Sequence, residues 1–257
     1  MNFGICNLSN IPLRIEPDDR SEMVSQVLFG DHFEVIGKSK HWIKIKLAFD
    51  DYQGWVDNKQ SLKITKKLYE ELDNSPIVVS YELVDFIEDK NTNELISIIL
   101  GSRLPFYAKN SLFINGKEYS FEGNTSGNTS SKESIVKTAF MYLNTPYLWG
   151  GKTPFGIDCS GFTQMVYRIN GHKLLREASQ QATQGEVLSF IEESEPGDLA
   201  FFDNDEGNII HAGIILANNY IIHASGKVRI DRLDQSGIYN AELRKHTHKL
   251  RVIKKIF

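Results

Sequence analysis

The first 65 residues show the short apolar runs and frequent turns of a small all-β module. Trp42–Leu47 alternates apolar and polar residues with a period of two, which predicts a half-buried strand. Phe33–Ile36 predicts a strand before it, and Gly54–Val56 predicts a strand after the turn-like Asp50–Tyr52. Short strands at this density favour a small β-barrel over residues 1–65.

Residues 66–125 open with a charged bridge at Lys66–Asp73, which leads into a second β-rich stretch. Its clearest apolar runs are Ile77–Val79 and Leu95–Leu100. Leu112–Tyr119 has the pattern of a hairpin, because the Asn115-Gly116 pair inside it accepts the positive φ angles of a type I′ turn. This stretch predicts a second small module.

The predicted elements change from strands to helices after Gly123–Thr129. This segment of small, polar residues is the best linker candidate. Ser130 and Glu133 fit a capping box that opens a helix through about Leu143. Cys159–Asn170 predicts a second helix, since its apolar residues follow the spacing i, i+3, i+4, i+7. Further strands are predicted at Leu199–Phe202, His211–Leu216, Tyr220–Ser225 and Leu250–Phe257. Helices followed by consecutive strands predict an α+β domain over residues 126–257.

Composition excludes several classes of protein. The chain has 257 residues, of which 41% are hydrophobic and 24% charged, with a net charge of −4. No Lys/Arg run supports nucleic-acid binding. No segment reaches the roughly 18 apolar residues of a membrane span, and residues 1–14 lack the pattern of a secretory signal. With only Cys6 and Cys159, both expected as free thiols, we expect a cytoplasmic protein if Met1 is the native start, and a cell-envelope protein otherwise.

Candidate chemistry centres on Cys159. The predicted helix places this residue in its first turn, where backbone N–H groups and the helix dipole favour an anion and depress the pKa of a thiol. His211 opens one predicted strand and His223 lies in the next, with a tight turn expected at Asn218-Asn219 between them. One imidazole can then form a hydrogen bond with the sulfur, while the other imidazole binds the second ring nitrogen of the first.

Two other interpretations of these residues stay open at this point. A single helical cysteine is usually a small core residue, and a single strand histidine is usually packed or exposed. Cys159, His211 and His223 could also bind zinc, although no CxxC or HxxxH spacing supports a metal site.

Four sequence blocks resemble the NlpC/P60 family of cysteine peptidases, in the family's order and over about half of the chain. They are Pro146–Gly151 with Asp158–Phe162, Pro196–Phe202, His211–Ile214 and Ile222–Ser225. The resemblance implies a papain-like α+β catalytic domain without a cofactor or metal.

The same resemblance assigns roles to single residues. Cys159 is implied as the nucleophile, His211 as the base and His223 as the orienting residue, and Tyr147 matches the position whose hydroxyl helps to form the oxyanion hole. Trp149 and Ser160 match positions that line the substrate site. Asp158 either binds the substrate amine or holds a local turn.

The first half resembles two bacterial SH3-like barrels, and the whole layout resembles γ-D-glutamyl-L-diamino acid endopeptidases of cell-wall recycling. This implies a murein peptide substrate, L-Ala-γ-D-Glu-diamino acid, cut after the γ-D-glutamyl residue. Glu22 and Tyr52 are then candidates for binding its free α-amine, since a carboxylate and a phenol oxygen suit an ammonium group.

Arg176 and Glu177 stand where this branch has an Arg-Asp segment that faces substrate. Arg176 could pair with a substrate carboxylate or pack on the surface, and the longer Glu177 leaves its contact open. Two other functions remain: an inert module that binds cell-wall fragments, and an amidase or acyltransferase with another substrate.

Overall fold

The computed structural model describes residues 2–127 and 131–257. The chain divides into two compact units, Met1–Asn128 and Thr129–Phe257, which are described separately. Within the part of the chain that the structure describes, no helix is both long and apolar enough to cross a membrane.

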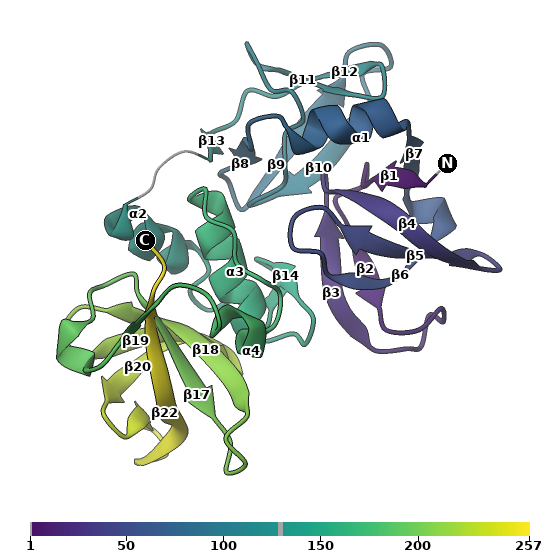
Figure 1. The fold of residues 1–257 in the computed structure, drawn as a ribbon. Coiled ribbons are helices and arrows are strands. Elements are labelled where there is room, and N and C mark those ends of the chain that lie inside the picture. The colour runs from purple at the N-terminus through teal and green to yellow at the C-terminus, as the bar shows by residue number, and fades with distance from the viewer. Residues whose placement is uncertain (1, 128–130) are drawn as a thin grey trace. The chain divides into compact units, whose positions relative to one another are not determined.

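The first unit begins with a seven-stranded antiparallel sheet that forms a small barrel, in the order β3-β2-β6-β5-β4-β1-β7 (Figure 1). Period-two burial is clearest in β5, which inserts alternate apolar side chains into the barrel interior. The strands are β1 (Phe3–Ile5), β2 (Asn10–Arg14), β3 (Met23–Leu28), β4 (His32–Ser39), β5 (Trp42–Leu47), β6 (Gln53–Asp57) and β7 (Leu62–Ile64), with a 3₁₀ turn η1 (Asn58–Gln60) before β7.

A helix, a four-stranded antiparallel sheet and a two-stranded pair complete the first unit. The sheet has the order β10-β9-β12-β11, and β8 pairs with β13. The elements are α1 (Lys66–Asp73), β8 (Val79–Ser80), β9 (Val84–Asp89), β10 (Leu95–Ile99), β11 (Ser111–Ile114), β12 (Lys117–Ser120) and β13 (Thr125–Ser126).

One hydrophobic core joins these two parts of the first unit. Ile5 and Phe29 of the barrel, Leu72 of α1 and Ile87 of β9 belong to the same buried cluster. β7 ends at Ile64 and α1 begins at Lys66, so the predicted division at residue 65 coincides with a boundary between elements. The parts on either side of it share their apolar core.

The second unit is built on a seven-stranded sheet in the order β16-β22-β17-β18-β19-β20-β21, which β21–β22 pairing closes (Figure 1). Helices α2, α3 and α4 pack against β18. The strands are β14 (Lys152–Thr153), β15 (Gly156–Ile157), β16 (Glu186–Leu188), β17 (Leu199–Asp203), β18 (Ile209–Leu216), β19 (Tyr220–Ser225), β20 (Lys227–Asp234), β21 (Gly237–Asn240) and β22 (Lys245–Lys255). The helices are α2 (Lys132–Met141), α3 (Cys159–Ile169) and α4 (Ala178–Gln181), with a 3₁₀ turn η2 (Ile191–Glu193).

Both predicted tight turns are present. Asn115 and Gly116 have φ values of 49° and 82° between β11 and β12, and Asn218 and Asn219 both have φ of 60° between β18 and β19. Positive φ at both central residues matches the right-handed twist of the flanking strands. The second turn makes β18 and β19 antiparallel neighbours, with Gly213 opposite His223.

Three local predictions were wrong or incomplete. The charged bridge Lys66–Asp73 is helix α1, which Thr65 caps by accepting from the Leu68 N–H at 3.1 Å. The linker candidate contains β13 at Thr125–Ser126, while its end at Thr129 lies outside the described residues. Ser130 also lies outside them, and the residue that caps α2 is Ser131.

Candidate active site

Cys159 is the first residue of α3, as the apolar spacing predicts. Asp158 precedes it as the N-cap, and its Oδ1 accepts a 2.6 Å hydrogen bond from the Gly161 N–H. Gly161 allows a close approach of the chain, because a Cβ there would lie 2.3 Å from the carbonyl oxygen of Gly151. The Gly-Gly turn at residues 150–151 can therefore press directly against the start of the helix.

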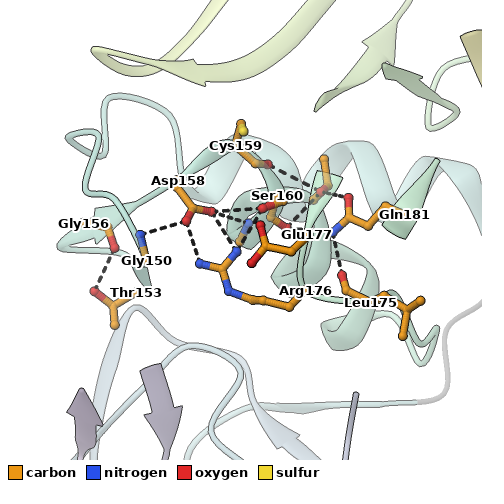
Figure 2. A network of polar contacts seen from close by, with 12 residues as sticks. Gly150, Thr153, Gly156, Asp158, Cys159, Ser160, Leu175, Arg176, Glu177 and Gln181 are labelled. Atoms are coloured by element: carbon orange, nitrogen blue, oxygen red, sulfur yellow. Dashed lines mark hydrogen bonds and ion pairs between the residues drawn. The ribbon is translucent and has the colours of Figure 1, made fainter. Parts of the chain in front are cut away.

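A buried ion pair fixes the start of α3 from below (Figure 2). Arg176 Nη2 donates to Asp158 Oδ2 at 2.6 Å, and Nη1 donates to Asp158 Oδ1 at 3.1 Å and to Ser160 Oγ at 2.9 Å. The Gly150 N–H also donates to Asp158 Oδ2, at 2.9 Å. Arg176 is 1% exposed, so it does not pack on the surface.

This network shows Asp158 in the turn-holding role, one of the two that its sequence position left open. Ser160 is 4% exposed, and its hydroxyl binds within the same network. Direct contacts of Asp158, Ser160 and Arg176 with substrate stay predictions. Glu177 is half-buried beside them and caps the short helix α4.

The sulfur of Cys159 lies against β18 at the position of His211. Sγ is 4.0 Å from the carbonyl oxygen of Ile210, and the Ala212 N–H donates a hydrogen bond to it. These two residues flank His211, so α3 and β18 bring the predicted nucleophile and base to the same place. Cys159 is 8% exposed.

The predicted low pKa of the Cys159 thiol is wrong for this structure. Burial raises the pKa of Cys159 to about 12, and the negative charge of Asp158 acts in the same direction. The helix start and the Ala212 N–H stabilise a thiolate, but loss of hydration outweighs them. At neutral pH the group is therefore a thiol, which needs a base to remove its proton.

Two histidines and a carboxylate form a continuous line across three neighbouring strands. His211 Nε2 lies 2.8 Å from His223 Nδ1, and His223 Nε2 lies 3.0 Å from Asp231 Oδ2 of β20. Burial, with the neighbouring charges of His223 and His248, lowers the pKa of His211 well below its usual value. A neutral imidazole, the form that can accept a proton, is thus favoured at neutral pH.

The sequence patterns did not point to two residues of this cluster, Asp231 and His248. Asp231 lies on β20, which was not predicted, although Val228 and Ile230 alternate with charged residues at its start and could have revealed it. The His248 ring stacks on that of His211, with centroids 4.2 Å apart and planes at 26°. Its pKa is lowered to about 4, mainly by burial. No local signal marks His248, because its ring meets that of His211, which lies on β18, far from β22 in the sequence.

Tyr147 and Trp149 lie on the segment that leads to Cys159. Burial, together with the charges of Cys159 and Asp158, raises the pKa of Tyr147 to about 12, so its phenol remains a hydrogen-bond donor at neutral pH. The Trp149 side chain is 60% exposed.

Glu22 and Tyr52 belong to the first unit. Glu22 is exposed next to the start of β3, and Tyr52 packs against the barrel core just before β6. Their contact with a substrate amine stays a prediction. Among residues 2–127 and 131–257, no group of three or more His, Cys, Asp or Glu side chains is arranged to hold a metal ion.

Comparison with known proteins matches both units to families. Residues 144–250 match the NlpC/P60 family, and residues 13–60 match the bacterial dipeptidyl-peptidase SH3 domain. The second unit is thus an NlpC/P60 domain, and a bacterial SH3 domain precedes it in the chain. The predicted family is confirmed, and so is the predicted fold class of an NlpC/P60 domain preceded by an SH3-like barrel. The second SH3-like barrel expected over residues 66–125 stays a prediction.

Individual relatives agree with this assignment. A γ-D-glutamyl-L-lysine dipeptidyl-peptidase of Bacillus subtilis is 28% identical over 239 residues, which cover 85% of this chain and 78% of the relative. Dipeptidyl-peptidase 6 of Lysinibacillus sphaericus is 27% identical, with 90% and 92% covered. The crystal structure of an NlpC/P60 family protein from Bacillus cereus has the same fold, with a TM-score of 0.84, 19% identity and 99% of each chain covered. Family and relatives support a cysteine peptidase that acts on peptidoglycan.

Proposed function

We propose that this protein is a cysteine endopeptidase of cell-wall recycling that cuts murein peptides between γ-D-glutamate and the diamino acid, when L-alanine at their N-terminus is free. The observation that carries the proposal is the meeting of Cys159, at the start of α3, with His211 and His223 on adjacent strands. The name of the Bacillus subtilis relative, a γ-D-glutamyl-L-lysine dipeptidyl-peptidase, supports the bond and the class of substrate, and the name of the Lysinibacillus sphaericus relative supports a dipeptidyl-peptidase.

The first chemical step is attack of the Cys159 sulfur on the γ-glutamyl carbonyl carbon. The thiol proton passes to His211 as the carbon–sulfur bond forms, because the raised pKa of the thiol leaves little thiolate to attack beforehand. The carbonyl oxygen becomes an oxyanion, for which the Cys159 N–H and the Tyr147 hydroxyl are the proposed donors.

The second step releases the two products. His211, now an imidazolium, gives its proton to the nitrogen of the diamino acid as the carbon–nitrogen bond breaks, which leaves a thioester on Cys159. Water then attacks the thioester while His211 takes one of its protons, and the returning proton restores the thiol. His223 holds the ring of His211 through both steps.

Asp158, Ser160, Arg176 and Glu177 support the proposed site from beneath. The ion pair of Arg176 with Asp158 fixes the first turn of α3, and thus the position of the sulfur. Trp149 is proposed to contact the substrate through its exposed ring.

Recognition of a free N-terminus is tested with a matched pair of peptides. We expect the protein to release diaminopimelate from L-Ala-γ-D-Glu-diaminopimelate, and to cut the N-acetylated peptide far more slowly, as measured by mass spectrometry. Equal rates would contradict the requirement for a free amine and remove Glu22 and Tyr52 from the proposal. No cleavage of either peptide would overturn the proposed substrate.

Glu22 and Tyr52 are then tested one at a time. E22Q and Y52F should raise KM for the free peptide with little change in kcat, because an amine remote from the reacting carbonyl contributes to binding in both ground and transition states. E71Q, on the exposed surface of α1, is the control and should leave both constants unchanged.

A further inference from the structure

The line of polar groups behind Cys159 does not end at His223. His211, His223 and Asp231 come from β18, β19 and β20 in turn, and their exposed fractions are 5%, 1% and 6%. The two contacts that link them, 2.8 Å and 3.0 Å, are both within hydrogen-bond distance. Each ring nitrogen in these contacts must therefore act as either donor or acceptor, and the choice at one end sets the choice at the other.

The charge of Asp231, at the far end of this line, decides which atom donates in each of the two hydrogen bonds. Arg229 lies with Nε 2.7 Å from Asp231 Oδ2, and its Nη2 donates to Oδ1 at 3.0 Å. A guanidinium is always charged, and a two-point contact of this kind keeps the carboxyl group ionised. An ionised carboxylate can only accept, so His223 Nε2 must carry a proton and donate it to Asp231.

The rest of the proton order follows from neutral imidazole chemistry. When His223 is neutral and protonated at Nε2, its Nδ1 is an acceptor. His211 must then donate its Nε2 proton to that atom, which leaves Nδ1 of His211 unprotonated. Nδ1 is the nitrogen that can take the thiol proton.

We infer that Asp231, held by Arg229, is a positioning residue that fixes the proton order of His223 and His211 and so keeps Nδ1 of His211 basic. This inference rests on the proposed role of His211 as the base for Cys159. Asp231 touches neither the substrate nor the sulfur in this scheme, and it acts through the two rings.

The groups that face this line from neighbouring elements are consistent with the scheme. His248 of β22 stacks on His211, and its centroid is 5.7 Å from that of His223. Its lowered pKa of about 4 keeps it uncharged at neutral pH. Glu242 accepts from Arg229 Nη1 at 3.3 Å, through the guanidinium nitrogen that does not contact Asp231.

The variant D231N tests the inference with little change in side-chain shape. The amide can donate to His223 Nε2, which reverses both tautomers and places a proton on Nδ1 of His211. We expect kcat to fall by about 10²–10⁴-fold, the scale on which a wrong catalytic tautomer acts. D231E, which keeps a carboxylate, should recover part of the loss.

The control carboxylate is on the same strand. Asp234 accepts from His246 Nε2 at 2.8 Å in an exposed pair outside the line, so D234N repeats the chemical change at a place where the inference predicts no effect on kcat. A loss in D231N with D234N unchanged supports the inference. Equal kcat in D231N and the unsubstituted protein overturns it.

A direct readout separates proton order from structural damage. In protein labelled with ¹⁵N-histidine, NMR should show His223 protonated at Nε2 and His211 protonated at Nε2 near pH 7, and D231N should reverse both. His223 protonated at Nδ1 in the unsubstituted protein would overturn the inference, even if D231N did not fold.

Thiol reactivity separates failure of this inference from failure of the proposed function. Alkylation of Cys159 by iodoacetamide needs no substrate, and D231N should slow it at least about tenfold at pH 7. If the murein peptides were not cut at all, the alkylation rates and the tautomers would still decide the role of Asp231.

Discussion

The two cysteines of this protein are both buried but have very different neighbours. Cys6 is fully buried in the barrel core, and its Sγ lies within hydrogen-bond distance of two carbonyl oxygens, those of Leu8 at 3.3 Å and Val27 at 3.6 Å. Cys159 is 8% exposed, at a helix start that faces a strand carrying a histidine. Burial raises the pKa of both thiols to about 12.

The comparison teaches that neither burial nor thiol pKa distinguishes a packed cysteine from a candidate nucleophile here. The difference lies in the groups that can move a proton and stabilise a charge once the reaction begins. Cys6 packs among apolar side chains such as Ile11 and Leu13, whereas Cys159 has a line of imidazoles behind it. A reactive site on a buried thiol is thus defined by its base.

The largest expected effect is on turnover. C159A should reduce hydrolysis of the murein peptide by about 10⁴-fold or more, because it removes the sulfur that forms the thioester at the proposed site. C6A should retain kcat, since that thiol only fills the barrel core. The comparison fails if steady-state assays find C159A active, or C6A as inactive as C159A in a folded protein.

The second effect is on the free energy of unfolding. It compares a substitution in the polar surroundings of Cys159 with one in the apolar surroundings of Cys6. R176M leaves Asp158 buried without its partner and should cost about 3–5 kcal/mol of the free energy of unfolding. I11V, in the core around Cys6, should cost about 0.5–1.5 kcal/mol. Urea unfolding of the two variants measures the difference, and equal small losses would mean that the Arg176 pair does not anchor α3.

The third effect is on thiol reactivity in the native protein. Cys159 should react with iodoacetamide at least about tenfold faster than Cys6 at about pH 7.5, because His211 can take its proton. Peptide mapping by mass spectrometry gives both rates in one experiment. H211A should bring the rate at Cys159 down toward that at Cys6; an unchanged rate would remove His211 as the base.

The smallest effect is on stability in acid, and it is tested with one histidine from each unit. The pKa values of His248 and His32 are both lowered to about 4, chiefly by burial, with the charge of Arg103 also acting on His32. Between about pH 6.5 and pH 4 the unfolded chain binds protons that the folded chain does not, so stability falls as pH falls through this window.

Thermal unfolding between pH 7 and pH 4 measures this acid effect. H248Q should reduce the loss of Tm on acidification in the unit that contains Cys159, and H32Q should reduce it in the unit that contains Cys6, each by a few degrees. An acid slope that neither variant changes would show that other groups control it.

Local sequence patterns predicted the elements that depend on neighbouring residues. The period-two run of β5, the apolar spacing of α3 and the Asn-containing turns at 115–116 and 218–219 are set by short-range sterics and side-chain alternation. Strand β20 and helix α1 were missed, and the predicted cap of α2 was one residue away from Ser131. The sequence motifs also predicted that Cys159 and both histidines share one site.

The amino-acid sequence by itself determined which chemical groups this protein has, and where along its helices and strands they fall. Only the tertiary structure decided that Arg176 pairs with Asp158, that Asp231 and His248 join the histidines, and that the thiol of Cys159 has a raised pKa. The physical reason is that desolvation and cross-strand pairing depend on segments distant in the chain, so they can reverse what a helix start favours locally.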